Sequence, residues 1–267
     1  MKIAFVSAGV LAFCLIAGCG RPVVKEEPIV ASSEIPVIER AELLGRQIYM
    51  QDLYAAQATA LLLAHGLDLI DIGTLGWITE SSRDGCAVTF VAGDPEQWRS
   101  VCVVTFAESA EPNIILVDRD LTETQSAMFN ARQLALHSIE KSCSDAYNTV
   151  VLPRDDGPGW LGYALAATND PNLILIGGHS RVTVSADGRT ILERRSFTKD
   201  CMVLKTPQDV GPDVDVAAYT VGHVLDNTPT EVHVFLSLLY GKPLYVVTAD
   251  RRFWYIEGGK IRILKRP

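Results

Sequence analysis

The chain has 267 residues, of which 48% are apolar, and its formal net charge is −8. An acidic chain with no long basic stripe argues against nucleic acid as a partner, because phosphate recognition depends on clustered Lys and Arg. The residues beyond position 38 suffice for one large domain or two small ones, and none of their apolar runs reaches membrane-spanning length.

The first apolar run, Ile3 to Ile16, ends just before a cysteine. It is shorter than the roughly 20 residues of a membrane span and is typical of a secretory signal peptide. The sequence Ile16-Ala17-Gly18-Cys19 resembles the lipobox of bacterial lipoprotein precursors. The resemblance implies that residues 1–18 are removed and that a lipidated Cys19 anchors the protein in the cell envelope. An ordinary cleaved signal peptide is the alternative.

Gly20 follows the predicted lipidation site. In lipoproteins of enteric-type bacteria, an Asp at this position tends to retain the protein in the inner membrane. By the same resemblance, Gly20 favours the outer membrane, with the folded part facing the periplasm. The predicted partners are thus the membrane, through the lipid, and an envelope protein or a glycan.

The first half of the mature chain predicts a tether, a helix and a β-meander. Residues 19–38 hold three prolines and no aromatic residue, which indicates an extended tether. A stretch rich in Leu, Ala and Gln predicts a helix over 39–65, closed by Gly66. Alternating apolar residues then predict strands over 76–80, 86–92, 100–107 and 113–118.

The second half repeats this order with a longer run of strands. Thr122 and Gln125 have the spacing of a capping box, which predicts the start of a second helix. Turn residues at 186–189 and 257–260 indicate tight hairpins. The predicted strands are 149–153, 159–167, 172–185, 189–197, 230–239, 243–249, 252–257 and 260–264.

Helices that precede runs of antiparallel strands predict an α+β fold, with each helix packed across a β-meander. We expect two helix-plus-meander units, over residues 39–120 and 121–267, which could share one sheet or form two. In topology this arrangement resembles two cystatin-like or PepSY-like units, the second enlarged.

Four cysteines lie beyond the predicted anchor. Cys14 would leave with the signal peptide and Cys19 would be acylated. An even number of remaining thiols in an oxidising compartment favours disulfides, and four cysteines allow three pairings. The four are Cys86, Cys102, Cys143 and Cys201.

We favour the pairing Cys86–Cys102, because it comes with a credible strand register. An antiparallel alignment that places these two cysteines opposite each other also places Phe90 opposite Trp98, an aromatic pair on the same face. The remaining pair is Cys143–Cys201. Four buried thiols remain the alternative.

Polar side chains gather on one face of two predicted strands. Alternation in 172–185 and 230–239 separates His, Arg and Glu from Val and Leu. If the helices cover the apolar faces, the polar side chains are left uncovered and could bind an acidic or sugar-like ligand or hold a metal. The solvated side of an antiparallel sheet has the same pattern, which is the alternative. The predicted binding residues are His179, Arg181, Glu231 and His233.

Other motifs indicate no cofactor and no metal site. The GPGWLG run at 157–162 has dinucleotide-binding spacing but suits a turn into a strand better. Asp155 and Asp156 lack the further oxygen ligands that calcium requires. His223 and Asp226 are spaced so that they could touch, but one such pair does not make a site. The sequence motifs of serine hydrolases, zinc proteases and P-loop proteins are absent.

These features favour an envelope-anchored lipoprotein whose periplasmic domain binds a ligand or partner without catalysis. The alternative is a hydrolase acting on peptide or cell-wall material, in which some members of a set formed by Cys201 and three histidines would carry the chemistry. A structural subunit of an envelope complex is a third hypothesis, and it predicts an exposed apolar patch. The histidines of the hydrolase hypothesis are His179, His223 and His233.

Overall fold

A computed structural model describes residues 30–205 and 216–264, so Cys19 and most of the predicted tether lie outside the described residues. Over these ranges the fold is α+β, with three helices and four sheets in which antiparallel pairing dominates. This confirms the predicted fold class. No helix in the described ranges is both long and apolar enough to cross a membrane. The division of the chain near residue 120 stays a prediction.

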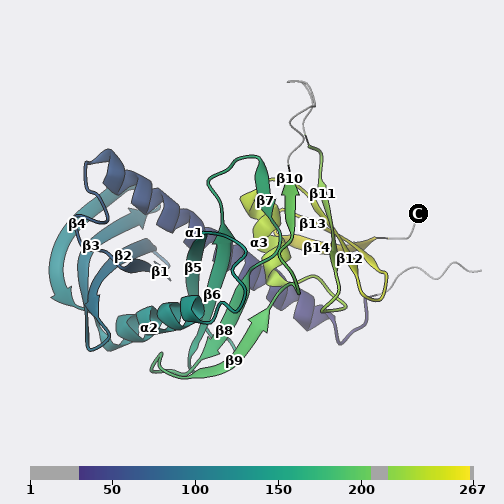
Figure 1. Cartoon of the computed structure of the whole chain (residues 1–267), viewed down its shortest axis with the longest axis horizontal. Coiled ribbons are helices and arrows are strands. Elements are labelled where there is room, and N and C mark those ends of the chain that lie inside the picture. Colours follow the sequence, from purple (N-terminus) through teal and green to yellow (C-terminus); the bar gives the residue numbers. More distant parts are fainter. Residues whose placement is uncertain (1–29, 206–215, 265–267) are drawn as a thin grey trace, which may run out of the picture.

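Helix α1 (Ile35–Ala64) runs along the whole molecule, from the last sheet past the central sheet to the first (Figure 1). It begins four residues before the predicted start, because Pro36 fits the first helical turn, where its missing N–H leaves no bond unmade. Its C-terminal end is as predicted. Gly66 adopts a φ of 73°, and the Leu67 N–H donates to the Leu62 carbonyl.

The first sheet is the predicted β-meander, in the order β1-β2-β3-β4. The C-terminal half of α1 covers it through a cluster that includes Leu62, Phe90 and Val104. The strands are β1 (Gly76–Ser82), β2 (Gly85–Asp94), β3 (Gln97–Ala107) and β4 (Ala110–Asp120).

Helix α2 (Glu123–His137) begins at the predicted capping box, in which the Gln125 N–H donates to the Thr122 hydroxyl. It packs on one face of a central sheet with the order β5-β6-β8-β9. A Cβ on Gly162 would lie 2.9 Å from the Ala131 carbonyl oxygen, so the small glycine permits the close approach of helix and sheet. The central strands are β5 (Ala146–Pro153), β6 (Trp160–Ala167), β8 (Ser180–Val184) and β9 (Ile191–Ser196).

The prediction of one strand over 172–185 is wrong. Strand β7 (Leu173–Leu175) pairs with β10 (Val203–Lys205) in a separate two-stranded sheet, and β8 begins afresh at Ser180. The break lies at Gly177 and Gly178. Gly178 has a φ of 89°, a backbone conformation that residues with a side chain rarely adopt and that interrupts a strand.

The last sheet has the order β11-β12-β13-β14, with β11 and β12 parallel. Parallel neighbours need a crossover, and helix α3 (Glu231–Leu239) supplies it. The hairpin at 257–260 is confirmed, since Gly258 and Gly259 both have positive φ. The strands are β11 (Tyr219–His223), β12 (Leu244–Thr248), β13 (Phe253–Glu257) and β14 (Lys260–Leu264).

The prediction of a strand over 230–239 is therefore wrong. The segment alternates Val and Leu with polar residues, but its ends carry helix signals: Thr230 is the N-cap, Glu231 lies in the first turn, and Gly241 follows the C-cap. Seven of its nine residues are buried, between α1 and the last sheet. In a segment of only nine residues, this alternation of polar and apolar side chains mimics a strand, and the pattern alone does not separate strand from helix.

Cys143 and Cys201 form the described disulfide, as predicted. The favoured pairing of Cys86 with Cys102 is wrong, and both are free, buried thiols. In the observed register Cys86 lies opposite Phe106, and Cys102 lies opposite Phe90. The turn between β2 and β3 is tighter than we assumed, with Asp94 opposite Gln97, and a bulge after Phe90 shifts the register further.

A peptide map of the unreduced, unfolded protein tests this cysteine pattern. We expect one linked pair of peptides, containing Cys143 and Cys201, whereas Cys86 and Cys102 are alkylated as free thiols only after unfolding, because both are buried. Replacing Cys143 and Cys201 together by Ser should lower the free energy of unfolding by about 2–5 kcal/mol, because the bond closes a loop of 58 residues. A linked Cys86–Cys102 peptide would contradict the observed register.

Candidate functional site

The four predicted binding residues lie inside the protein rather than on an open sheet face. His179, Arg181, Glu231 and His233 are only 2–6% exposed. The alternation along β8 is as predicted, because Val182 and Val184 pack toward α2 while Arg181 points to the opposite side. The error is that the opposite side is covered as well, by α3. The prediction that these polar side chains lie on an uncovered face is therefore wrong.

Arg181 and Glu231 form a buried ion pair between β8 and the first turn of α3. The Arg181 Nη1 donates to the Glu231 Oε1 at 2.6 Å, and the Tyr163 hydroxyl donates to the same oxygen at 3.3 Å. Burial raises the pKa of Tyr163, which keeps its hydroxyl protonated as a donor. The buried Glu231 carboxylate thus accepts from two donors of the protein itself and is not exposed for binding a ligand.

His179 is held by backbone groups on both ring nitrogens. Its Nδ1 accepts from the Ala166 N–H at 3.2 Å, and its Nε2 lies 3.0 Å from the Leu175 carbonyl oxygen. This pairing requires the neutral ring, protonated on Nε2. Burial lowers the pKa of His179 to about 4, so the ring is neutral at pH 7.

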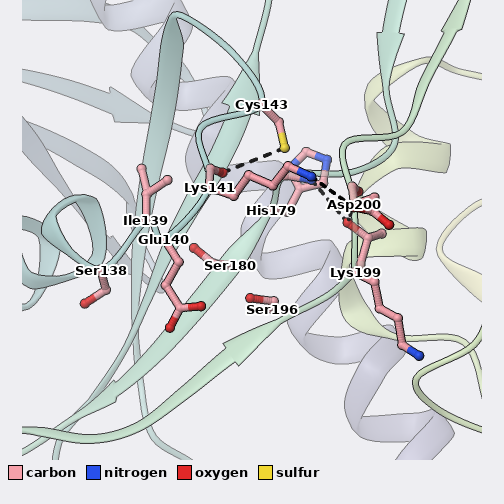
Figure 2. Close-up of a pocket in the computed structure, with 12 residues that line it drawn as sticks. Ser138, Ile139, Glu140, Lys141, Cys143, His179, Ser180, Ser196, Lys199 and Asp200 are labelled. Carbon is pink, nitrogen blue, oxygen red and sulfur yellow. Dashed lines mark hydrogen bonds and ion pairs between the residues drawn. The ribbon is translucent and has the colours of Figure 1, made fainter.

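A small hollow lies beside His179 and Cys143 (Figure 2), with a volume of about 100 Å³. Lys141 and Asp200 are joined there at 2.9 Å, next to the Cys143–Cys201 disulfide. Ser180 and Ser196 also line the hollow (Figure 2). The volume is well below that of typical small-molecule sites, which begin near 300 Å³.

Two further histidines meet at the N-terminal end of α3. The His223 and His233 rings pack edge to face, with centroids 4.7 Å apart. His223 contacts Asp226 at 2.8 Å, as its spacing suggested, although neither residue lies in a helix. Asp226 also accepts from Arg195, and these partners, His223 first, lower the pKa of Asp226. Burial lowers the pKa of His233 to about 3.

The remaining motifs have structural roles. Asp155 accepts two hydrogen bonds from Arg40, and Asp156 pairs with Arg154, so the two carboxylates do not converge on a cation. The GPGWLG run forms the turn into β6, as expected. No group of three or more His, Cys, Asp or Glu in the described ranges could hold a metal ion.

A larger cavity, of about 350 Å³, lies where α1, β6, β7 and β11 meet the C-terminal end of α3. Its walls are mainly apolar and include three aromatic rings. Asp52 of α1 and Asn148 of β5 are the polar groups on its inner side, and the Asn148 Nδ2 donates to the Asp52 Oδ1 at 2.9 Å. The lining residues used below are Asp52, Asn148, Ala167, Asp170, Tyr219, Phe235 and Tyr240.

Asp52 is the chemically distinctive group of this cavity. Asp52 is only 7% exposed, and this burial raises the pKa of its carboxyl to about 6. The hydrogen bond from Asn148 acts in the opposite direction and lowers the pKa. Mainly apolar cavities of this size, with a few converging polar groups and a perturbed titratable residue, are typical ligand sites. Asp52 and Asn148 also border a second hollow, of about 320 Å³, that extends along α1 to Trp77.

A shallower groove lies between α2 and the turns that end at Trp98 and Arg189. Trp98 and Trp160 both line it, but their indole N–H groups donate inside the protein, to Asn130 and the Ala186 carbonyl. The groove therefore offers ring surface and scattered polar groups. Among the residues that line it, Asp187 is an exposed turn residue whose pKa is lowered mainly by the Ser185 hydrogen bond.

Comparison with known proteins gives no match to a protein-family model, a curated protein or a solved structure. A functional assignment therefore depends on the geometry of this chain. On that geometry, the Asp52 cavity is the best candidate binding site.

Asp52 was missed by the sequence reasoning, although a signal was present. In the predicted helix it is spaced four residues after Ile48 and three before Ala55, and both of those side chains are buried. An acidic residue on the apolar stripe of a helix needs a partner or a function. The aromatic walls come from segments that only the tertiary fold brings together.

The stability of the protein should reveal the ionisation of Asp52. The folded-state pKa, about 6, lies above the unfolded value of about 4, so the folded chain binds more protons between these pH values. The free energy of unfolding contributed by this group therefore falls as pH rises from 4 to 6. Asp52→Asn keeps an acceptor for Asn148 and should raise the free energy of unfolding by about 1–3 kcal/mol at pH 8.

The same substitution should change stability little at pH 4, where Asp52 is protonated in the folded state and about half protonated in the unfolded state. Urea unfolding of both proteins at pH 4 and pH 8 measures the difference. Equal effects at the two pH values, or a loss of stability at pH 8, would contradict a buried carboxyl with a raised pKa.

Proposed function

We propose that this protein is an envelope-anchored lipoprotein whose folded domain binds a small ligand in the Asp52 cavity without catalysis. The single observation that carries the binding proposal is the cavity itself. Its volume, its aromatic walls and one buried carboxyl of raised pKa are the combination expected of a ligand site.

Three features support the location. The Ile16-Ala17-Gly18-Cys19 motif supports lipid anchoring at Cys19, and the Gly20 position supports the outer membrane. The Cys143–Cys201 disulfide suits an oxidising compartment such as the periplasm. A Cys19→Ser variant should move from the membrane fraction to the soluble fraction.

The hydrolase hypothesis has less support. Cys201, its thiol nucleophile, is bonded to Cys143. His179 uses both ring nitrogens on backbone groups, and His233 accepts from the Thr230 N–H. These histidines would have to leave their partners before they could act as bases.

A glycan or an envelope protein, the partners expected from the sequence, fits the Trp98–Trp160 groove better than the cavity. Ring surfaces next to amide and carboxylate groups suit sugar stacking. This second function would be independent of the cavity, so a variant that fills the cavity would leave it unchanged.

Binding of indole to the full-length protein in lipid nanodiscs tests the cavity proposal. Indole is a neutral aromatic probe that is small enough for the cavity, and saturation-transfer NMR or calorimetry measures its affinity. Ala167 lies at the end of β6 and lines the cavity, so Ala167→Trp should fill the space and weaken indole binding at least tenfold.

Ala110→Trp is the matched control, because Ala110 is exposed at the start of β4, away from the cavity. It should bind indole like the wild type. No indole binding by the wild type, or equal binding by the Ala167→Trp variant, would overturn the proposal.

A further inference from the structure

We propose that the Asp52 cavity selects a positively charged, amine-bearing ligand with an apolar or aromatic body. This inference depends on the proposed binding function and names the chemistry of its ligand. Three observations support it: the negative charge of the residues that line the cavity, the Asp52 Oδ2 atom, to which no described residue donates, and the aromatic side chains of the walls.

The charges of the lining are all of one sign. Asp52 lies on the inner side of the cavity and Asp170 lies in the loop before β7. Among the described residues that line the cavity, none is Lys, Arg or His. An anionic ligand would meet only like charge and lose its own hydration. A cation would meet the buried Asp52 carboxylate and the negative charge of Asp170, an exposed lining residue whose Oδ1 accepts from the Asn172 N–H.

The Asp52 carboxylate is positioned for one further donor. Asn148 donates to Oδ1 at 2.9 Å, which fixes the plane of the carboxylate. No described residue donates to Oδ2. Within the described residues, Asp52 forms no ion pair that would compensate its charge, and burial raises its pKa. An ammonium N–H from a ligand would supply the absent counter-charge and a charge-assisted hydrogen bond.

The aromatic walls suit the same chemistry. Tyr219 and Tyr240 pack edge to face, with centroids 6.3 Å apart, and Phe235, which lies on α3, also lines the cavity. The Leu175 N–H donates to the Tyr240 hydroxyl oxygen at 3.2 Å, which holds that ring in place. Aromatic faces attract ammonium groups and pack against an apolar body.

The adjoining hollow gives room for the body of the ligand. Asp52 and Asn148 border both spaces, so an amine bound to Asp52 could extend toward Tyr240 or along α1 toward Trp77. The second hollow is lined by Ala and Leu side chains of α1, which fits an apolar group rather than a second charge.

The test compares three probes of nearly equal shape and different charge, on the full-length protein in nanodiscs at pH 7.5. They are phenethylamine, 2-phenylethanol and 3-phenylpropionate, and calorimetry gives each affinity. We expect phenethylamine to bind at least tenfold more tightly than 2-phenylethanol, and 3-phenylpropionate to bind most weakly. Asp52→Asn should reduce the advantage of the amine to less than threefold.

Asp84→Asn is the matched control, because Asp84 is an exposed turn residue between β1 and β2. It removes the same charge and should leave the amine preference unchanged. A loss of preference in this variant would show that net charge, rather than Asp52, attracts the amine, and would overturn the inference.

The outcomes separate the inference from the proposed function. Equal affinities for the amine and the alcohol, both weakened by Ala167→Trp, would overturn the amine preference and leave cavity binding in place. Binding of none of the probes, including indole, would overturn both.

Discussion

The ion pair between Arg181 and Glu231 is the constraint on which the arrangement of this protein depends. Burying a guanidinium on the inner face of the central sheet costs free energy that a counter-charge offsets. The first turn of α3 brings that charge to 2.6 Å, with the Tyr163 hydroxyl as a second donor. The pair therefore fixes the N-terminal end of α3 against β8 and gives the helix its place between the central and last sheets.

The position of α3 determines the shape of the candidate site. Phe235 lies one turn beyond Glu231, and Tyr240 caps the far end of the helix, so both aromatic walls follow from the anchoring of its first turn. The opposite wall comes from α1, which packs closely on α3; a Cβ on Gly45 would lie 2.5 Å from the Val234 Cβ. Asp52, two turns after Gly45, thereby faces the space that α3 leaves open. The Arg181–Glu231 ion pair thus positions the helix that forms one wall of the proposed ligand site.

Much of the fold could be predicted because its signals are local. The capping box at Thr122, the glycine after α1 and the Gly258–Gly259 hairpin each act within a few residues. The failures involve contacts between distant segments. Glu231 and His233 were placed on a strand because polar and apolar residues alternate in this short segment. The predicted uncovered face is the one that the helix covers. Sequence reasoning grouped Arg181 with Glu231 correctly, but it assigned to binding what the tertiary fold uses for structure.

A double-mutant cycle on Arg181 and Glu231 tests this account most directly. Arg181→Met and Glu231→Leu should each lower the free energy of unfolding by about 3–5 kcal/mol, because each leaves a buried charge without its partner. The double variant should lose much less than the two single losses together, so that the coupling energy is about 2 kcal/mol or more. Single variants that unfold like the wild type, or losses that simply add, would contradict the role of this pair as the joint that holds α3 and shapes the cavity.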